Sequence, residues 1–499
     1  MSFATPTERD PAHQRAAKAQ RPRRVPTLII SAVGILLLLR AAIFVADAGL
    51  IGAGYAAKQL CSGVFVARLP ERFVVDTDVL PRLATVGPFA QLLDYSLDRR
   101  AGTVSASLLG QRVVAEYQPE TGCTLVQQQA REYGLPVPSR TSLSTLTDIS
   151  AAQRADATSA DAAADEPNST PPLPALTGAL DGALNNAFAE SITGNRNTLA
   201  VVVLHRGQRI AARYADPVTA STPMQGWSMN KSLMATFIGY QVDSGKLSLE
   251  SPVIDALEKQ RSDAAIIGRV DTTLTLGHLL SMTSGFDFSE RYFPGDDVTD
   301  MLYQQPAMWL SAPRTGHRDP PGTRFAYSSG DINLASLIWQ QSLEEEPYTD
   351  WLSSNFSQPL GLAEMVLEPD ASGIQVGSSY AYLTADDWAR MGQLWLDAWH
   401  GRSDTISQAW QRQAVTPGTA INGEIYGLGF WLNTDRRAFP HAPPSAFYAG
   451  GNSGQFVVVL PEQELVVVRL GLTLDESQAD VDSLLRDVIA ATAPLATAP

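Results

Sequence analysis

The stretch from residue 226 to residue 245 reads GWSMNKSLMATFIGYQVDSG, and it decides how the fold is interpreted. Its apolar side chains recur at helical spacing and Gly245 ends the pattern, which predicts a helix over residues 228–244. Ser228 and Lys231 stand three positions apart at the start of this helix and therefore share one face. A serine is a weak nucleophile that needs a neighbouring base, and burial of a lysine lowers its pKa so that the amine can accept a proton. The pair predicts a nucleophile and its base.

The beginning of this predicted helix favours the same chemistry. A helix N-terminus carries positive potential, which disfavours a charged Lys231, and it presents the backbone N–H of Ser228 to a developing oxyanion. The alternative interpretation is a serine that caps the helix beside a lysine in solvent. The flanking residues Trp227, Leu233 and Met234 are apolar and argue against a solvated lysine.

A second motif, residues 325–330, reads FAYSSG. It follows a Pro-Gly-Thr turn and precedes a helical run over residues 333–343. A tyrosine on a loop before a helix is placed to donate or relay a proton, so Tyr327 is a candidate partner of the serine and the lysine. An ordinary buried loop tyrosine is the alternative interpretation.

A third motif, residues 449–455, reads AGGNSGQ and precedes an apolar strand. Glycines in such a segment let a substrate approach the backbone closely. A backbone N–H of this segment is therefore a candidate second donor of an oxyanion hole, while a plain β-turn is the alternative interpretation.

The order of these three motifs resembles that of the serine β-lactamase and penicillin-binding-protein family. The resemblance covers residues 176–495 and includes residues 274–285, which read LTLGHLLSMTSG. Within that family, residues 377–380 (GSSY) and 426–433 (YGLGFWLN) are most similar to the branch of 6-aminohexanoate-dimer hydrolases and carboxylesterases. The resemblance implies a serine hydrolase that needs no cofactor or metal.

The resemblance also implies a role for each residue that matches a motif. Ser228 is the nucleophile that becomes acylated, Lys231 is its base, and Tyr327 passes a proton to the leaving group. The backbone N–H groups of Ser228 and Asn452 form the oxyanion hole. The implied candidates for substrate contact are Tyr292, Ser329, Gly451 and Gln455.

Two departures from the family pattern bear on the substrate. The second motif ends in Ser329, where β-lactamases usually carry asparagine, and the third motif has Asn452 or Ser453 in place of the cation that holds a carboxylate. These departures favour a small ester or amide as substrate. A D-Ala peptidase or β-lactamase is the second hypothesis, and a non-catalytic exported binding module is the third. Arg324 and Arg390 are candidate sources of charge for the second hypothesis, although surface pairing with an aspartate is the role expected of each.

The ends of the matching segment predict its sheet. Residues 198–204 and 208–214 read as one β-hairpin, and residues 455–460 and 465–472 read as another, with helices and loops between them. We therefore expect an α/β (α+β) fold of the β-lactamase/transpeptidase type. Its antiparallel sheet is assembled from both ends of the domain, and a helical lobe is inserted between the hairpins.

The N-terminal residues predict a membrane anchor. A basic tail at residues 1–24 precedes an apolar segment at 25–47, which is close to the length needed to span a bilayer. The basic flank places the tail in the cytoplasm and the rest of the chain in the periplasm, attached to the inner membrane. A cleaved signal peptide ending at residues 46–48 (ADA) is the alternative, although Arg40 interrupts a signal-like core.

The chain has two cysteines, Cys61 and Cys123, and export favours a disulfide between them. Such a bond stabilises the fold by about 4 kcal/mol in the chain-entropy model, while two buried free thiols are the alternative. The cysteines fall in a predicted small exported module at residues 58–130, with strand-like runs at 63–67, 73–75, 104–109 and 112–117. A linker rich in Ala, Asp, Ser and Pro is predicted at residues 150–174.

Composition excludes several classes of function. The 499 residues include 37 Lys and Arg against 52 Asp and Glu, a net charge of −15 that disfavours nucleic-acid binding. The six histidines are scattered and the cysteines lack zinc-site spacing, so no metal is implied. The expected partners are a small-molecule substrate and the membrane, and the sequence does not indicate an oligomeric state.

Overall fold

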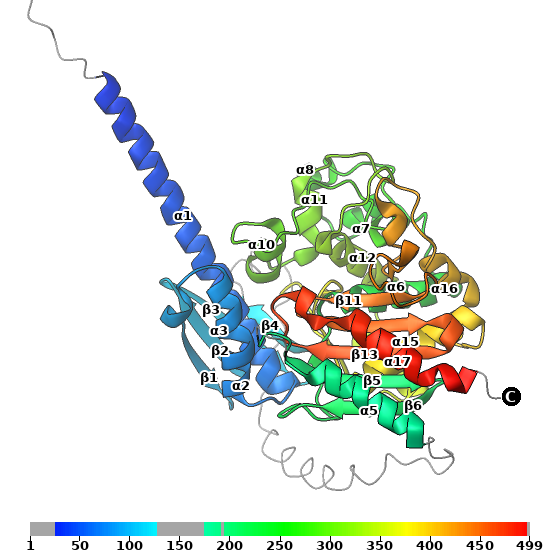
Figure 1. The fold of residues 1–499 in the computed structure, drawn as a ribbon. Helices are drawn as coiled ribbons and strands as arrows, with labels where there is room; N and C mark the ends of the chain where they lie inside the picture. Colours follow the sequence, from blue (N-terminus) through cyan, green and yellow to red (C-terminus); the bar gives the residue numbers. More distant parts are fainter. Residues whose placement is uncertain (1–24, 127–173, 191–193, 497–499) are drawn as a thin grey trace, which may run out of the picture. The chain divides into compact units, whose positions relative to one another are not determined.

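The computed structural model of this chain describes residues 25–126, 174–190 and 194–496 (Figure 1). The predicted basic tail at 1–24 lies outside these residues, as does all but the last residue of the predicted linker at 150–174. The boundaries of both segments therefore stay predictions.

The chain divides into two compact units, Met1–Val45 and Ala46–Pro499. Helix α1 (Val25–Cys61) begins in the first unit and ends in the second, fourteen residues beyond the predicted end of the anchor. The stretch from Val33 to Val66 contains an 18-residue window with a mean hydropathy of 2.1, and it is long and apolar enough to cross a membrane, by length and composition.

The second unit is built on a six-stranded antiparallel sheet with the strand order β10-β11-β12-β13-β5-β6. Its two hairpins come from the two ends of the matching segment, and β13 pairs with β5 to join them, as predicted. The strands are β5 (Thr198–His205), β6 (Gln208–Tyr214), β10 (Trp431–Leu432), β11 (Phe447–Gly451), β12 (Gln455–Leu460) and β13 (Leu465–Gly471).

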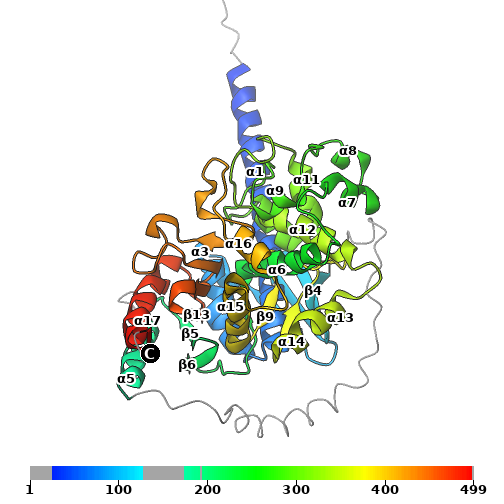
Figure 2. The same cartoon turned by 90° about the vertical axis from the view of Figure 1, so that its right-hand side faces the viewer.

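Helices cover both faces of this sheet. Helices α5 (Pro174–Phe188) and α17 (Val481–Ala496) lie on one face, and α15 (Ala385–His400) packs against β5, β12 and β13 on the other (Figures 1 and 2). Along β5, Val201 and Val203 belong to the apolar cluster under α5 and α17, while Ala200, Val202 and Leu204, which alternate with them, belong to the main core. This alternation with a period of two lets one strand serve two cores.

The segment between the hairpins forms the predicted helical lobe and a small sheet with the order β7-β9-β8. Helix α6 (Asn230–Asp243) is buried along nearly its whole length, and Phe237 packs with Trp339, Trp351 and Phe356. This packing fixes the helix that begins beside Ser228. The other elements are α7 (Val253–Lys259), α8 (Ala264–Ile267), α9 (Leu276–Leu280), α10 (Asp297–Gln304), α11 (Ser311–Thr315), α12 (Ser329–Ser342), α13 (Tyr348–Leu352), α14 (Gln358–Leu360), α16 (Gln408–Ala414), β7 (Met224–Gln225), β8 (Met365–Leu367) and β9 (Ala381–Leu383).

The predicted small module is part of the same compact unit and mixes helices with a four-stranded antiparallel sheet. Two of its four predicted strands are wrong: residues 63–67 continue helix α1 as a π-helical turn, and residues 73–75 are helical. A short apolar run has no periodicity that separates a strand from a buried helix, and here the run continues an existing helix. The elements of this part are α2 (Glu71–Val74), α3 (Leu80–Thr85), β1 (Asp94–Asp98), β2 (Thr103–Leu108), β3 (Gln111–Gln118) and β4 (Gly122–Val126).

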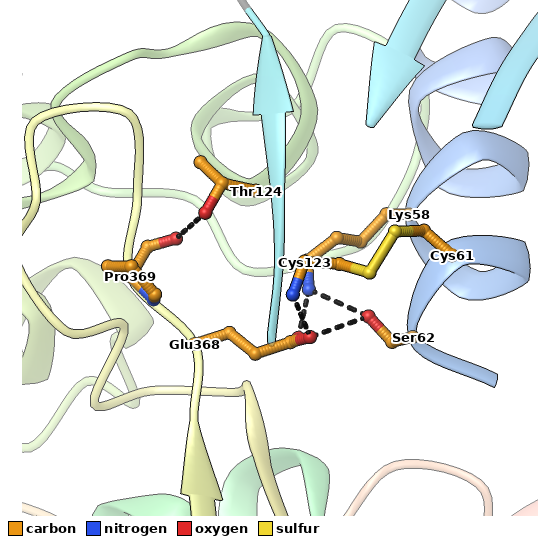
Figure 3. Close-up of a disulfide and its surroundings, with 7 residues drawn as sticks. All are labelled: Lys58, Cys61, Ser62, Cys123, Thr124, Glu368 and Pro369. Carbon is orange, nitrogen blue, oxygen red and sulfur yellow. Dashed lines mark hydrogen bonds and ion pairs between the residues drawn. A yellow bond between two sulfur atoms is a disulfide. The ribbon is translucent and has the colours of Figure 1, made fainter. Parts of the chain in front are cut away.

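The predicted disulfide joins Cys61 at the end of α1 to Cys123 on β4, with the two Cα atoms 6.0 Å apart (Figure 3). Beside it, Lys58 and Glu368 form an ion pair in which both side chains are buried. Oε1 of Glu368 also accepts hydrogen bonds from the Ser62 hydroxyl at 2.8 Å and from the Cys123 amide at 2.7 Å. These contacts clamp α1 and β4 to the segment that follows β8.

The close approach of β4 to Glu368 requires a glycine. Gly122 has a φ of 76°, and a Cβ atom there would lie 2.6 Å from Oε1 of Glu368. Two residues further along β4, the Thr124 hydroxyl donates a hydrogen bond to the carbonyl of Pro369 at 3.2 Å (Figure 3). Residues of the N-terminal module therefore contact the rest of the unit through backbone as well as side chains.

We predict that Glu368→Gln lowers the free energy of unfolding by about 3–5 kcal/mol, because it leaves the Lys58 charge buried without a counter-charge. The double variant Lys58→Met/Glu368→Leu is expected to lose much less, because it buries no charge. Urea unfolding followed by circular dichroism measures both.

The matched control is the ion pair of Arg68 with Glu364, which joins the same two parts at 2.7 Å with side chains that are 53% and 26% exposed. Glu364→Gln is expected to lose less than about 1 kcal/mol, as surface pairs do. Equal losses in the free energy of unfolding for the buried and the exposed pair would contradict the conclusion that the buried contacts hold α1 and β4 in place.

Candidate active site

Ser228 lies in a single 3₁₀ turn, Trp227–Met229, that leads directly into α6. Trp227 has a φ of 48°, in the left-handed region that bulky residues rarely adopt. Strand β11 runs against this turn, because Gly451 has no side chain: a Cβ there would lie 2.1 Å from the carbonyl oxygen of Gly226 and 3.1 Å from the amide nitrogen of Ser228. The serine is thus held by a strained turn between a helix and a strand.

Lys231 is only 1% exposed, and its amine points at the serine. Its Nζ lies 3.0 Å from Oγ of Ser228, 3.0 Å from Oγ of Ser329 and 3.1 Å from the carbonyl oxygen of Ser378. Burial lowers the pKa of Lys231 from 10.5 to about 8, with the charge of Glu290 acting in the opposite direction. The amine is therefore much easier to deprotonate than a lysine in water.

Tyr327 comes from the loop before α12 and joins this pair. Its ring centroid lies 4.8 Å from Nζ of Lys231, and the ring stacks on Trp431 at 5.1 Å between centroids. Burial raises the pKa of Tyr327 well above the ordinary value, and the charge of Glu290 raises it further, while a hydrogen bond with Ser228 opposes them. The phenol thus keeps its proton at neutral pH.

Glu290 is a site residue that the sequence analysis missed. Its Oε2 accepts the amide of Ser329 at 2.7 Å, and its Oε1 accepts the Ser329 hydroxyl at 2.5 Å. Burial raises the pKa of Glu290, and the positive charge of Lys231 opposes this rise. Polar groups therefore run without a break from Ser228 through Lys231 and Ser329 to a carboxylate.

Tyr292 lies at the edge of the same site. Its hydroxyl donates to Oε1 of Glu290 at 3.3 Å, and its backbone has a φ of 61°. The carboxylate of Asp296 holds this strained loop by accepting the backbone N–H of Tyr292 at 3.2 Å and that of Arg291. No local sequence pattern marks Glu290, because this loop has no regular strand or helix periodicity, and only the contacts with Ser329 and Tyr292 reveal the carboxylate.

These side chains surround an open cleft of about 370 Å³. Three of the aromatic side chains that line the cleft are Tyr327 and Trp431, which belong to predicted motifs, and Tyr448 of β11. The cleft is lined by Ser228, Glu290, Tyr292, Tyr327, Trp431, Tyr448, Gly450, Gly451, Asn452, Phe456 and Glu476.

The turn between β11 and β12 presents Asn452 to the cleft, whereas Gln455 faces into the turn. Nε2 of Gln455 donates to the carbonyls of Asn452 and Ser453, each at 3.2 Å, and its Oε1 accepts the amide of Gly471 at 3.0 Å. Its side chain is 1% exposed. This position favours a role in shaping the turn over direct contact with a substrate, and Ser329 likewise lies behind the cleft, between Lys231 and Glu290.

Arg82 of α3 brings a cation to this turn from the N-terminal module. Its Nη2 donates to Oδ1 of Asn452 at 2.9 Å and to Oγ of Ser453 at 2.7 Å. The two arginines considered from the sequence have other partners: Arg324 pairs with Asp319 at 3.4 Å, and Arg390 donates to the carbonyl of Gly361. The third motif therefore has a cation after all, supplied by a distant part of the chain.

Comparisons with known proteins show which proteins this chain is similar to. The family model described as Beta-lactamase matches residues 184–490. Penicillin-binding protein 4 of Amycolatopsis lactamdurans is 32% identical over 198 residues, which are 39% of this chain, and the chain spans about half, 48%, of that protein's length.

Solved structures are also similar to this chain, at low identity. A Bacillus anthracis protein assigned as a 6-aminohexanoate-dimer hydrolase is 19% identical, with a TM-score of 0.51 over 61% of this chain and 81% of that one. A penicillin-binding protein homologue from Caulobacter crescentus is 18% identical, with a TM-score of 0.49 over 65% of this chain and 99% of that one.

We predict that the burial of Lys231 makes the stability of the protein depend on pH. The pKa of Lys231 is lower in the folded state than in the unfolded chain, so the unfolded chain binds more protons and stability rises as the pH rises from 8 towards 10.5. Relative to Lys231→Met, the wild type should gain about 2.5 kcal/mol between pH 7 and pH 10.

Urea unfolding of both proteins at the two pH values measures this difference. Lys246→Met, which changes an exposed lysine just beyond the same helix, is the control and should show no such trend. A constant difference between wild type and Lys231→Met would show that the amine is not desolvated.

Proposed function

The chain belongs to the beta-lactamase family, whose members are serine hydrolases, and we propose that it hydrolyses a small ester or amide through an acyl intermediate on Ser228. The observation that carries this proposal is the buried amine of Lys231, 3.0 Å from the serine oxygen and with a pKa lowered to about 8. A base whose pKa lies near the working pH is both available and strong enough to activate a serine.

In the first step Lys231 takes the proton of Ser228 as the serine oxygen attacks the substrate carbonyl. The negative charge that develops on the carbonyl oxygen is stabilised by backbone N–H groups, for which we propose those of Ser228 and Asn452. The start of α6 and the end of β11 place these two residues on the lining of one cleft. The product of this step is a tetrahedral intermediate on the serine.

In the second step the bond to the leaving group breaks and the leaving atom takes a proton from Tyr327. The high pKa of this phenol supports a donor that is protonated before the step. Lys231 lies 4.8 Å from the ring centroid and returns the proton that it took from Ser228 to the phenol, so the proton count balances. Water then attacks the acyl-serine, and the same groups act in reverse order to release the acid.

We further propose that α1 anchors the enzyme in the inner membrane, with the second unit in the periplasm. The apolar stretch within α1 supports the anchor. The arginines that precede it, Arg21, Arg23 and Arg24, support an N-terminus in the cytoplasm. The disulfide between Cys61 and Cys123 supports an oxidising compartment for the rest of the chain.

A D-Ala peptidase or a β-lactamase is the second candidate, and one observation favours it. Arg82 places a positive charge on the side chains of Asn452 and Ser453, a role for which the sequence analysis had considered only Arg324 and Arg390. A guanidinium is well suited to bind a carboxylate of the kind that such substrates carry. The substrate class therefore has to be decided by experiment.

We predict that intact-protein mass spectrometry will detect an acyl adduct after brief exposure to p-nitrophenyl acetate, and that Ser228→Ala will abolish it. Hydrolysis of the ester should fall by at least about 1,000-fold, because the remaining site lacks a nucleophile. Ser244→Ala, at the other end of α6, is the matched control and should keep the wild-type rate.

The same measurement with a labelled penicillin separates the two candidates. Acylation of Ser228 by the ester but not by the penicillin supports the esterase or amidase, and efficient acylation by the penicillin supports the second candidate. Adduct formation that persists in Ser228→Ala would contradict both.

We predict that Glu290→Gln moves the rising limb of the pH profile of kcat/KM to lower pH. This limb reports the deprotonation of Lys231 in the free enzyme, with a pKa of about 8 in the wild type. The charge of Glu290 raises the pKa of Lys231, so removing the charge lowers that pKa. Ester hydrolysis measured between pH 5 and pH 10 checks the direction.

Glu476→Gln is the control for this experiment, because Glu476 lines the same cleft but is absent from the groups that shift the pKa of Lys231. It should leave the limb in place. A shift to higher pH in Glu290→Gln would contradict the assignment of the limb to the lysine.

A further inference from the structure

An apolar pocket of about 130 Å³ lies between the N-terminal module and the helical lobe. One wall is the part of α1 that belongs to the second unit, and others are the end of α3, the segment after it, and the end of β2. The apolar side chains that line it include Ile51, Leu83, Val86, Phe89, Leu108 and Tyr303.

This pocket adjoins the cleft that holds Ser228. Tyr292 and Asn452 line both the pocket and the cleft, so the two spaces share a wall. Trp227, the residue before the nucleophile, also lines the pocket. A group attached to a carbonyl carbon at Ser228 therefore has an apolar space within reach.

The side of the site that holds Tyr327 and the side that opens to the pocket are suited to different halves of the substrate, the leaving group and the acyl group. Tyr327, which donates a proton to the leaving group in the proposed function, stacks with Trp431 in the cleft. The pocket is instead bounded by Trp227, Tyr292 and Asn452. A leaving group that departs toward Tyr327 leaves the acyl group facing the pocket.

We propose that this pocket binds the alkyl chain of the substrate's acyl group, and that the enzyme prefers linear acyl chains of about six carbons. The inference rests on the proposed function. The volume is similar to that of an engineered apolar cavity of about 150 Å³ that binds benzene, which has six carbons. Each methylene that moves from water into such a space favours binding.

Arg82 does not oppose this assignment, although it also lines the pocket. Its guanidinium is held by Asn452 and Ser453, at the end shared with the cleft. The charge thus lies near the reacting group, and the aliphatic and aromatic side chains Ile51, Leu83, Val86, Phe89 and Leu108 remain to contact the alkyl chain. The N-terminal module would then select the acyl chain.

The experiment measures kcat/KM for p-nitrophenyl acetate, butyrate, hexanoate and octanoate with the full-length protein. We expect the wild type to prefer hexanoate to acetate by at least about tenfold. Val86→Trp fills the pocket from a residue that is 40% exposed, so it should lower this preference to about threefold or less. Leu92→Trp, at a residue of the same segment that is 59% exposed, is the matched control and should keep the wild-type preference.

A second variant changes the pocket in the opposite direction. Phe89→Ala enlarges it and should move the preferred ester from hexanoate toward octanoate. Opposite changes in chain-length preference cannot come from general damage to the fold. If all four proteins hydrolyse acetate and share the same chain-length preference, the assignment of the pocket is overturned. A wild type that hydrolyses no ester would instead contradict the proposed function itself.

Discussion

The desolvated amine of Lys231 is the constraint on which the rest of the site depends. A charge in this position is unfavourable because the side chain is 1% exposed, and the fold tolerates the amine only by surrounding it with the oxygens of Ser228, Ser329 and Ser378. The same burial that destabilises the ammonium form makes the neutral form accessible near neutral pH. The burial of Lys231 therefore both makes its amine a usable base and lowers the stability of the folded protein.

Such a group requires a rigid surrounding, and α6 supplies it. Nearly every residue of this helix is buried, the polar ones included, and the aromatic cluster around Phe237 encloses one side of it. Strand β11 closes the other side through Gly451, which admits the backbone of residues 226–228 at a distance that any side chain would prevent. Ser228, the proposed nucleophile, is thus fixed by packing that the proposed chemistry itself does not use.

The sequence predicted the sheet and the three motifs because their signals are local. The strands at 208–214 and 455–460 have the predicted bounds, since alternation and turn residues mark both ends. Glu290 and Arg82 carry no such local mark. Each acts through a contact with a residue distant in sequence, 39 positions away for Glu290 with Ser329 and 370 for Arg82 with Asn452. Only the folded chain brings these pairs together.

The N-terminal module explains why a chain of this family carries a buried ion pair far from its nucleophile. A pair such as Lys58 with Glu368 adds little net stability compared with apolar residues of similar size, but it permits one arrangement of its two partners. Here that arrangement, together with the bond between Cys61 and Cys123, fixes the module from which Arg82 reaches the third motif. Directional contacts, rather than apolar area alone, therefore position Arg82 beside the cleft. The same contacts position the part of the N-terminal module that lines the proposed acyl pocket.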